Sequence, residues 1–196
     1  SIDQILEAEI IPKAIIVVHM HGKTCDMEPI VKWAKENSVL VLEDASQAHL
    51  SHTKNIKAGC AGDVSVFSLY PTKNLGAMGD AGIVVTNDQV IANNIRQKTS
   101  YGNEIGNKYK HIVSGVNSRL DEIQAAILNV NLKYLDFWNE KQIPLNGKFH
   151  SMSDRRLRII NIRQSVKRTA KSSICNSSSI ILVIDYVSKV LHIILT

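Results

Sequence analysis

The chain has 196 residues, of which 44% are hydrophobic and 5% are aromatic, and it carries a formal net charge of +5 at pH 7. This length is sufficient for one buried core, and no uninterrupted apolar run reaches the roughly 20 residues that cross a bilayer, so a membrane-spanning protein is not expected. The charge is uneven, because residues 143–196 hold nine of the 23 basic residues but two of the 18 acidic ones.

Short apolar runs alternate with amphipathic stretches over the first 142 residues, which is typical of a layered α/β sheet. We expect, in chain order, a strand at 14–18, a helix at 27–37, strands at 39–42, 63–67 and 82–86, a helix at 87–98 and a long helix at 118–138. Asp26 is the expected N-cap of the first helix, and Asn87 or Asp88 is that of the second.

The amino-acid composition changes after residue 142. We therefore treat residues 143–196 as a separate, unmatched basic and apolar tail whose fold the sequence does not predict. Its apolar run at 180–195 contains Asp185, Lys189 and His192, so it predicts a strand or helix of a core rather than a membrane span. The basic residues of the tail lack interleaved aromatic side chains, which favours a solvated segment over a nucleic-acid partner.

The three cysteines, Cys25, Cys60 and Cys175, are odd in number and widely spaced. This spacing fits neither a disulfide framework nor a tetrahedral zinc site. We therefore expect no metal and a reducing cytoplasm.

Two carboxylates follow the apolar strand predicted at 39–42. Glu43 and Asp44 come directly after it, and Gln47 and His49 lie within five further positions. Ligands of open α/β sheets sit at the carboxyl ends of the strands. A carboxylate at this place could bind a metal, cap a helix or pair with a cationic ring nitrogen, and the residues alone leave these alternatives open.

A hydroxyl and an amine follow the strand predicted at 63–67. Ser68 and Lys73 are five positions apart, with a turn fixed by Pro71 between them. A hydroxyl can bind a phosphate, and a lysine in a partly apolar site becomes a nucleophile toward a carbonyl carbon. A lone lysine is otherwise a solvated surface charge. The glycines at 76, 79 and 82 permit close backbone approach but match neither the dinucleotide fingerprint nor the ATPase phosphate loop.

These segments together resemble one family, the sugar aminotransferases of the DegT/DnrJ/EryC1/StrS group, which have the aspartate aminotransferase-like fold. The resemblance is carried, in matching order and spacing, by Val18 to Gly22, Glu43 to His49, Phe67 to Gly82, Val85 to Asp88 and Gly115 to Ala126. It implies that residues 1–142 form an incomplete three-layer α/β large domain that binds pyridoxal 5'-phosphate (PLP).

The resemblance also implies roles for individual residues. Lys73 would bind PLP covalently and move the proton in catalysis, and Asp44 would pair with the pyridine nitrogen. Gln47 would hydrogen-bond the ring hydroxyl, and Ser68 the phosphate. Asn117 would reach the phosphate of a neighbouring subunit in a homodimer.

Four of the residues in these segments receive less specific expectations. Asn117 has an alternative as the N-cap of the long helix, and Arg119 would lie near the shared site. His19 and His49 are expected to be structural or supporting residues.

The implied function is transfer of an amino group from an amino acid, expected to be glutamate, to a nucleotide-linked keto-sugar. Family members are about twice as long, so an alternative is a truncated or frame-shifted inactive fragment. We expect the chain as given, taken alone, to bind PLP weakly or not at all and to show no measurable aminotransferase activity. A dehydratase of the same family would carry His where Lys73 stands, and Lys73 argues against it.

Overall fold

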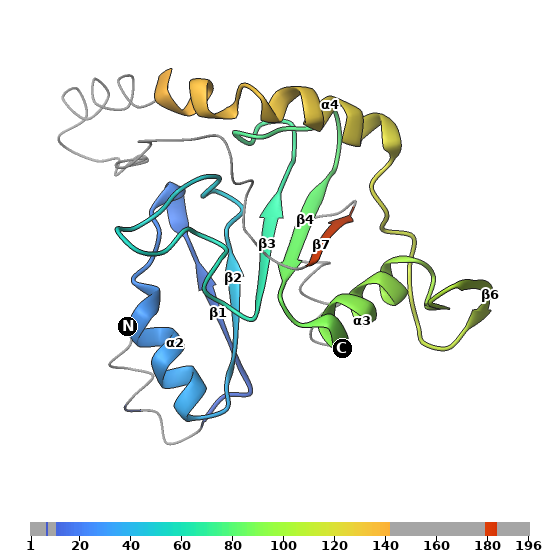
Figure 1. Ribbon diagram of the computed structural model, residues 1–196, viewed down its shortest axis with the longest axis horizontal. Coiled ribbons are helices and arrows are strands. Elements are labelled where there is room, and N and C mark those ends of the chain that lie inside the picture. Colours follow the sequence, from blue (N-terminus) through green and yellow to red (C-terminus); the bar gives the residue numbers. More distant parts are fainter. Residues whose placement is uncertain (1–6, 8–10, 142–178, 184–196) are drawn as a thin grey trace.

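The computed structural model describes residue 7 and residues 11–141 and 179–183. In chain order its elements are β1 (Ala14–Val18), the short 3-10 turn η1 (Met20–Gly22), α2 (Met27–Glu36), β2 (Leu40–Asp44), β3 (Val64–Ser68), β4 (Gly82–Thr86), α3 (Gln89–Thr99), β5 (Asn103–Glu104), β6 (Asn107–His111), α4 (Glu122–Leu132) and β7 (Ser179–Val183). Figure 1 shows them arranged around one sheet, with β5 and β6 forming a separate hairpin.

The described part of the sheet has the strand order β1-β2-β3-β4-β7. Strands β1, β2 and β3 are parallel to one another, whereas β4 is antiparallel to both β3 and β7. The carboxyl ends of β2 and β3 therefore meet at one edge of the sheet (Figure 1), and Lys73 comes five residues after the end of β3 in the sequence.

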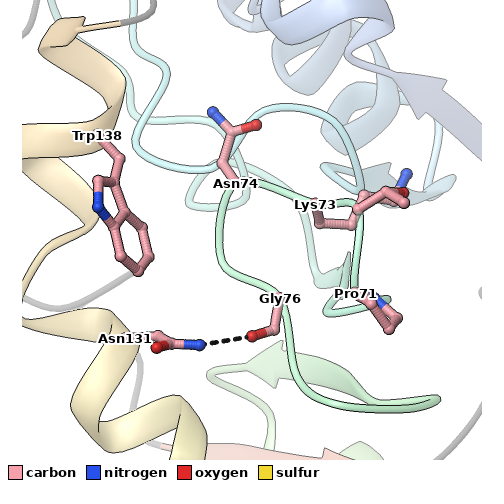
Figure 2. A pocket seen from close by; sticks show the side chains of 7 residues that line it. Pro71, Lys73, Asn74, Gly76, Asn131 and Trp138 are labelled. Carbon is pink, nitrogen blue, oxygen red and sulfur yellow. Dashed lines mark hydrogen bonds between the residues drawn. The ribbon is translucent and has the colours of Figure 1, made fainter.

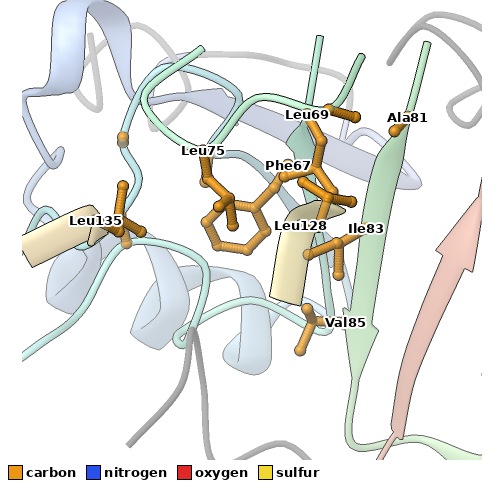
Figure 3. Close-up of a cluster of buried hydrophobic side chains, with 12 residues drawn as sticks. Phe67, Leu69, Leu75, Ala81, Ile83, Val85, Leu128 and Leu135 are labelled. Atoms are coloured by element: carbon orange, nitrogen blue, oxygen red, sulfur yellow. The ribbon is translucent and has the colours of Figure 1, made fainter. Parts of the chain in front are cut away.

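Helices cover both faces of the sheet, so the three-layer α/β architecture expected from the sequence is confirmed. On one face, Leu42, Val66 and Val84 pack with Ala92 and Ile95 of α3. On the other face, α2 and α4 cover two further apolar clusters. Figure 3 shows the larger of these, in which Phe67, Ile83 and Val85 of the sheet lie against Leu128 of α4 and Leu135.

The strands agree closely with the sequence patterns. β1 and β4 have the expected bounds, and β2 and β3 end at Asp44 and Ser68, two and one residues later than expected. Asp88 is the N-cap of α3, and its side chain accepts from the backbone N–H groups of residues 90 and 91. Asp26 occupies the N-cap position of α2 without a side-chain capping bond.

The long helix predicted at 118–138 differs from the structure. α4 begins at Glu122 with Asp121 as its N-cap, a turn interrupts it at residues 133–134, and helical conformation resumes from 135 to 141. The start is delayed because the preceding segment is held at the end of α3, where the Ser118 N–H donates to the Thr99 carbonyl at 2.9 Å. The alternative role of Asn117 as a helix N-cap is therefore wrong.

The tail enters the described residues at β7, a strand within the apolar run that was predicted to form a strand or helix. The rest of that prediction lies outside the described residues.

The cysteines differ from the expectation. Cys25 is a free thiol, but Cys60 takes part in a disulfide. The cysteine spacing therefore no longer supports a cytoplasmic location, which stays a prediction. None of the described helices is long and apolar enough to span a membrane.

Candidate functional site

The candidate site begins with two polar side chains on neighbouring strands. Asp44, the last residue of β2, is in register with Val66 of β3, and Ser68 lies two residues further along β3. Because side chains alternate between the faces of a strand, Asp44 and Ser68 are on the same face. Asp44 is partly buried, and its Oδ1 accepts from the Ser46 backbone N–H at 3.0 Å. Ser68 is buried.

Lys73 lies on the loop that joins β3 to β4, residues 69–81, which we call the lysine loop. Its backbone N–H donates to the Tyr70 carbonyl at 2.8 Å, and its side chain is partly buried. The loop then folds back on itself, so that a Cβ at Gly76 would lie 2.6 Å from the Pro71 carbonyl oxygen. Glycine is therefore required at residue 76 for the loop to close on Lys73.

His49 lies in the core near Lys73 as a neutral imidazole. Burial, together with the positive charge of Lys73, lowers its pKa from 6.5 to about 4. Its ring is 5.7 Å from that of Phe67. The His49 Nε2 and the nearby Ser46 Oγ are buried without a hydrogen-bond partner among the described residues. Buried polar atoms are seldom left unpaired, so these two atoms are candidate contacts for a polar group.

A second buried group lies on the opposite face of β2, and it confirms the expectation that His19 is a structural residue, although its pairing with Glu43 was not predicted. Glu43 and His19 are both fully buried, and the Nε2 of His19 is 2.8 Å from Oε2 of Glu43. Because His19 Nδ1 accepts from the Cys25 backbone N–H, its Nε2–H donates to the carboxylate. The strand pattern could have revealed Glu43, since Val41 and Ala45, two residues before and after it, are both apolar and buried.

The Glu43 carboxylate also fixes the loop that leads into β3. It accepts from the backbone N–H groups of Gly59, Ala61 and Gly62 at 2.6 to 2.8 Å. Burial alone raises the pKa of Glu43, but the hydrogen bonds from His19 and from these three backbone groups outweigh burial and lower it. The ionised carboxylate thus ties β2, and with it Asp44, to the start of β3.

Gln47 lies beside this edge and is exposed. Its Oε1 accepts from the His21 backbone N–H at 2.8 Å, while His21 has a φ of 55°, in the left-handed region. This bond ties the segment after β2 to the turn after β1. The amide nitrogen of Gln47 thereby faces away from that bond and can donate to another group.

The structure does not bring Asn117 to the lysine loop. Asn117 is exposed and forms a β-bridge with Ser100, the residue that follows α3. Arg119 is exposed too, and its guanidinium lies 5.1 Å from the centre of the Tyr101 ring. In one chain these residues therefore form a second polar surface, separate from Asp44, Ser68 and Lys73.

A pocket of about 300 Å³ opens between the lysine loop and the helix after β6. Lys73, Asn74 and Gly76 line one side, and Asn131 and Trp138 line the other (Figure 2). The Asn131 Nδ2 donates to the Gly76 carbonyl at 2.9 Å across it. No group of three or more metal-ligating side chains is found among the described residues.

Comparison with known proteins gives the site a context. The model of the DegT/DnrJ/EryC1/StrS aminotransferase family matches residues 2–186, which extends past residue 142, where the resemblance was expected to end. The protein named dTDP-3-amino-3,4,6-trideoxy-alpha-D-glucose transaminase of Streptomyces venezuelae is 39% identical over 149 residues, covering 75% of this chain and 39% of that protein.

Solved structures have the same fold. An aminotransferase of this family from Brucella abortus superposes with a TM-score of 0.67 at 33% identity, over 76% of this chain and 40% of its own. NtdA of Bacillus subtilis, solved with bound cofactor PMP, gives a TM-score of 0.59 at 31% identity, over 72% and 33%. The chain thus spans well under half the length of the curated relatives that it matches.

Proposed function

The chain belongs to the DegT/DnrJ/EryC1/StrS aminotransferase family, and we propose that it carries the PLP-binding edge of an enzyme that aminates a nucleotide-linked keto-sugar. The observation that carries this proposal is the placement of Asp44 and Ser68 on one face of adjacent strands, with Lys73 on the loop that follows. An amine, a carboxylate and a hydroxyl are the groups that an aldehyde, a pyridine nitrogen and a phosphate require.

The residues of this edge fit PLP chemically. Lys73 would bind the cofactor covalently, Asp44 would hold a proton on the ring nitrogen, and Ser68 would donate to the phosphate. Gln47 would donate from its amide nitrogen to the ring hydroxyl, since its oxygen is already engaged by His21. The unpartnered atoms of Ser46 and His49 are consistent with a polar ligand at this edge.

Bound there, PLP supplies an electron sink that makes the α-carbon proton of an amino acid acidic. The Lys73 amine would serve as the acid and base that moves the proton in each half of the transfer, which is general acid–base catalysis. Burial of His49, together with the positive charge of Lys73, keeps its imidazole neutral, as its pKa of about 4 implies. His49 therefore adds no second positive charge beside the lysine.

The substrate class is inferred from relatives. The Streptomyces relative is named a transaminase of a dTDP-linked sugar, and an Acidithiobacillus ferrooxidans relative, 41% identical over 137 residues, is named an aminotransferase of a UDP-linked one. We extend this class to the present chain, with glutamate as amino donor. We also propose a homodimer, in which the exposed Asn117 reaches the phosphate site of the partner and Arg119 lies near it.

Absorbance separates cofactor binding from turnover. We expect PLP titrated into the chain to give the visible absorbance of the lysine-bound cofactor, even if occupancy is low, and we expect Lys73→Ala to abolish it. Lys35→Ala, the same change at an exposed lysine of α2, is the matched control and should keep the signal. Equal absorbance from both variants would contradict the assignment of Lys73.

A further inference from the structure

Three amide side chains of α4 and its helical continuation bind the lysine loop. Gln124 and Asn131 are seven residues apart, which places them on about the same face of α4, and Asn139 lies beyond the turn at residues 133–134. The bonds are Met78 N–H to Gln124 Oε1 at 2.9 Å, Asn131 Nδ2 to the Gly76 carbonyl at 2.9 Å and Asn74 Nδ2 to Asn139 Oδ1 at 2.6 Å. Figure 2 shows the Asn131 bond and the Asn74 side chain above it.

Asn139 has a second partner, which makes it more than a loop contact. Its side chain is 3% exposed, and its Nδ2 also donates to the His49 carbonyl at 3.4 Å. His49 ends the segment that begins at Asp44, whereas Asn74 directly follows Lys73. One buried amide therefore connects the segment after β2 with the lysine loop after β3.

We propose that Asn139 and Asn131 are positioning residues that hold Lys73 in place relative to Asp44, an inference that rests on the proposed role of both residues toward PLP. The lysine loop contains Gly76 and Gly79, so its backbone has more freedom than an ordinary loop. Bonds to a packed helix remove that freedom before any ligand binds. The lysine amine is then presented in one place, which is the structural requirement for a covalent site.

The helix is a suitable support because the core anchors it independently of the loop. Leu128 and Leu135 are buried in the cluster of Figure 3, between the amide-bearing positions. Leu128 lies three residues before Asn131, and Leu135 four residues before Asn139. Each amide is thus within about one turn of a buried leucine, and its backbone position is set by the core rather than by the loop.

Hydrogen–deuterium exchange on the full chain tests this directly. In Asn131→Ala and Asn139→Ala, we expect the amides of residues 73–78 to exchange about fivefold faster, the effect of one lost hydrogen bond. The amides of β4, residues 82–86, should keep their wild-type rates. Asn129→Ala is the matched control, since Asn129 is exposed on the same helix.

A positioning role also predicts a chemical readout. With excess PLP and borohydride, the labelling of Lys73 relative to Lys35 in the same chain should fall in Asn131→Ala and Asn139→Ala and stay at the wild-type ratio in Asn129→Ala. If Asn139→Ala does not fold, Asn74→Ala removes the same bond from the loop side and should speed exchange in the same way.

Two results would overturn the proposal. One is that the amides of residues 73–78 exchange no faster in Asn131→Ala and Asn139→Ala than in the control Asn129→Ala. Asn74→Ala takes the place of Asn139→Ala in this comparison if Asn139→Ala does not fold. The other is faster exchange throughout β4 as well, because that would show general destabilisation. Failure of the proposed function would give a different result. If Lys73 is not labelled selectively in the wild-type chain, PLP binding at Lys73 is contradicted. The exchange rates of residues 73–78 still decide, independently of PLP, whether Asn131 and Asn139 order the lysine loop.

Discussion

Acidification should destabilise this chain through His49. In the folded state the pKa of His49 is about 4, against 6.5 for the ordinary group, because the ring is buried and lies near the Lys73 charge. Between these values the unfolded chain binds a proton that the folded chain does not. Stability is therefore fully present above pH 6.5 and is lost as the pH falls toward 4. The difference in pKa corresponds to about 3 kcal/mol.

Urea unfolding followed by circular dichroism at pH 7.5, 5.5 and 4.5 measures this loss. We compare the wild-type chain with His49→Gln, which has no titrating ring, and with His111→Gln, a control on the exposed β5–β6 hairpin. His49→Gln lowers stability by a constant amount but should lose up to about 3 kcal/mol less between pH 7.5 and 4.5. An equally steep loss in wild type and His49→Gln would refute the neutral, buried imidazole.

Two further predictions concern groups that shape the site. Glu43→Gln should lower the free energy of unfolding by about 3 kcal/mol, because it removes the charge that accepts from His19 and three backbone N–H groups. Glu36→Gln, on the exposed surface of α2, should change the free energy of unfolding little. Equal urea midpoints for the two variants would contradict the role of Glu43. Gly76→Ala should lower borohydride-trapped PLP at Lys73 severalfold, since its Cβ meets the Pro71 carbonyl. Gly106→Ala is strained by its own φ of 86°, but it lies in the β5–β6 hairpin, outside the lysine loop, and should leave that labelling unchanged; mass spectrometry of the peptides separates the two outcomes.

The sequence was sufficient for the strands that carry the site. β-branched apolar runs produced β1 and β4 with the expected bounds, because a buried strand requires little besides such residues. It was sufficient as well to predict that Asp44 and Ser68 follow neighbouring strands. Their common face, by contrast, depends on the register of β2 against β3, which only the structure supplies.

Long-range contacts explain what the sequence could not predict. Apolar periodicity favoured a helix from residue 118, but the bond from the Ser118 N–H to the Thr99 carbonyl holds that residue in another conformation. The Glu43–His19 pair joins residues 24 positions apart, and Asn139 reaches His49 across 90. Spacing within one segment carries no sign of partners at such distances.

The measurement that tests the central claim most directly is the map of PLP attachment along the chain. The full chain is incubated with PLP, reduced with borohydride and digested, and the pyridoxyl group is located by mass spectrometry. We predict that Lys73 is labelled in preference to the exposed Lys35 and Lys110 at low PLP concentration, whatever the total occupancy. Labelling that follows exposure alone, with Lys73 below those two lysines, would contradict a PLP site at the ends of β2 and β3.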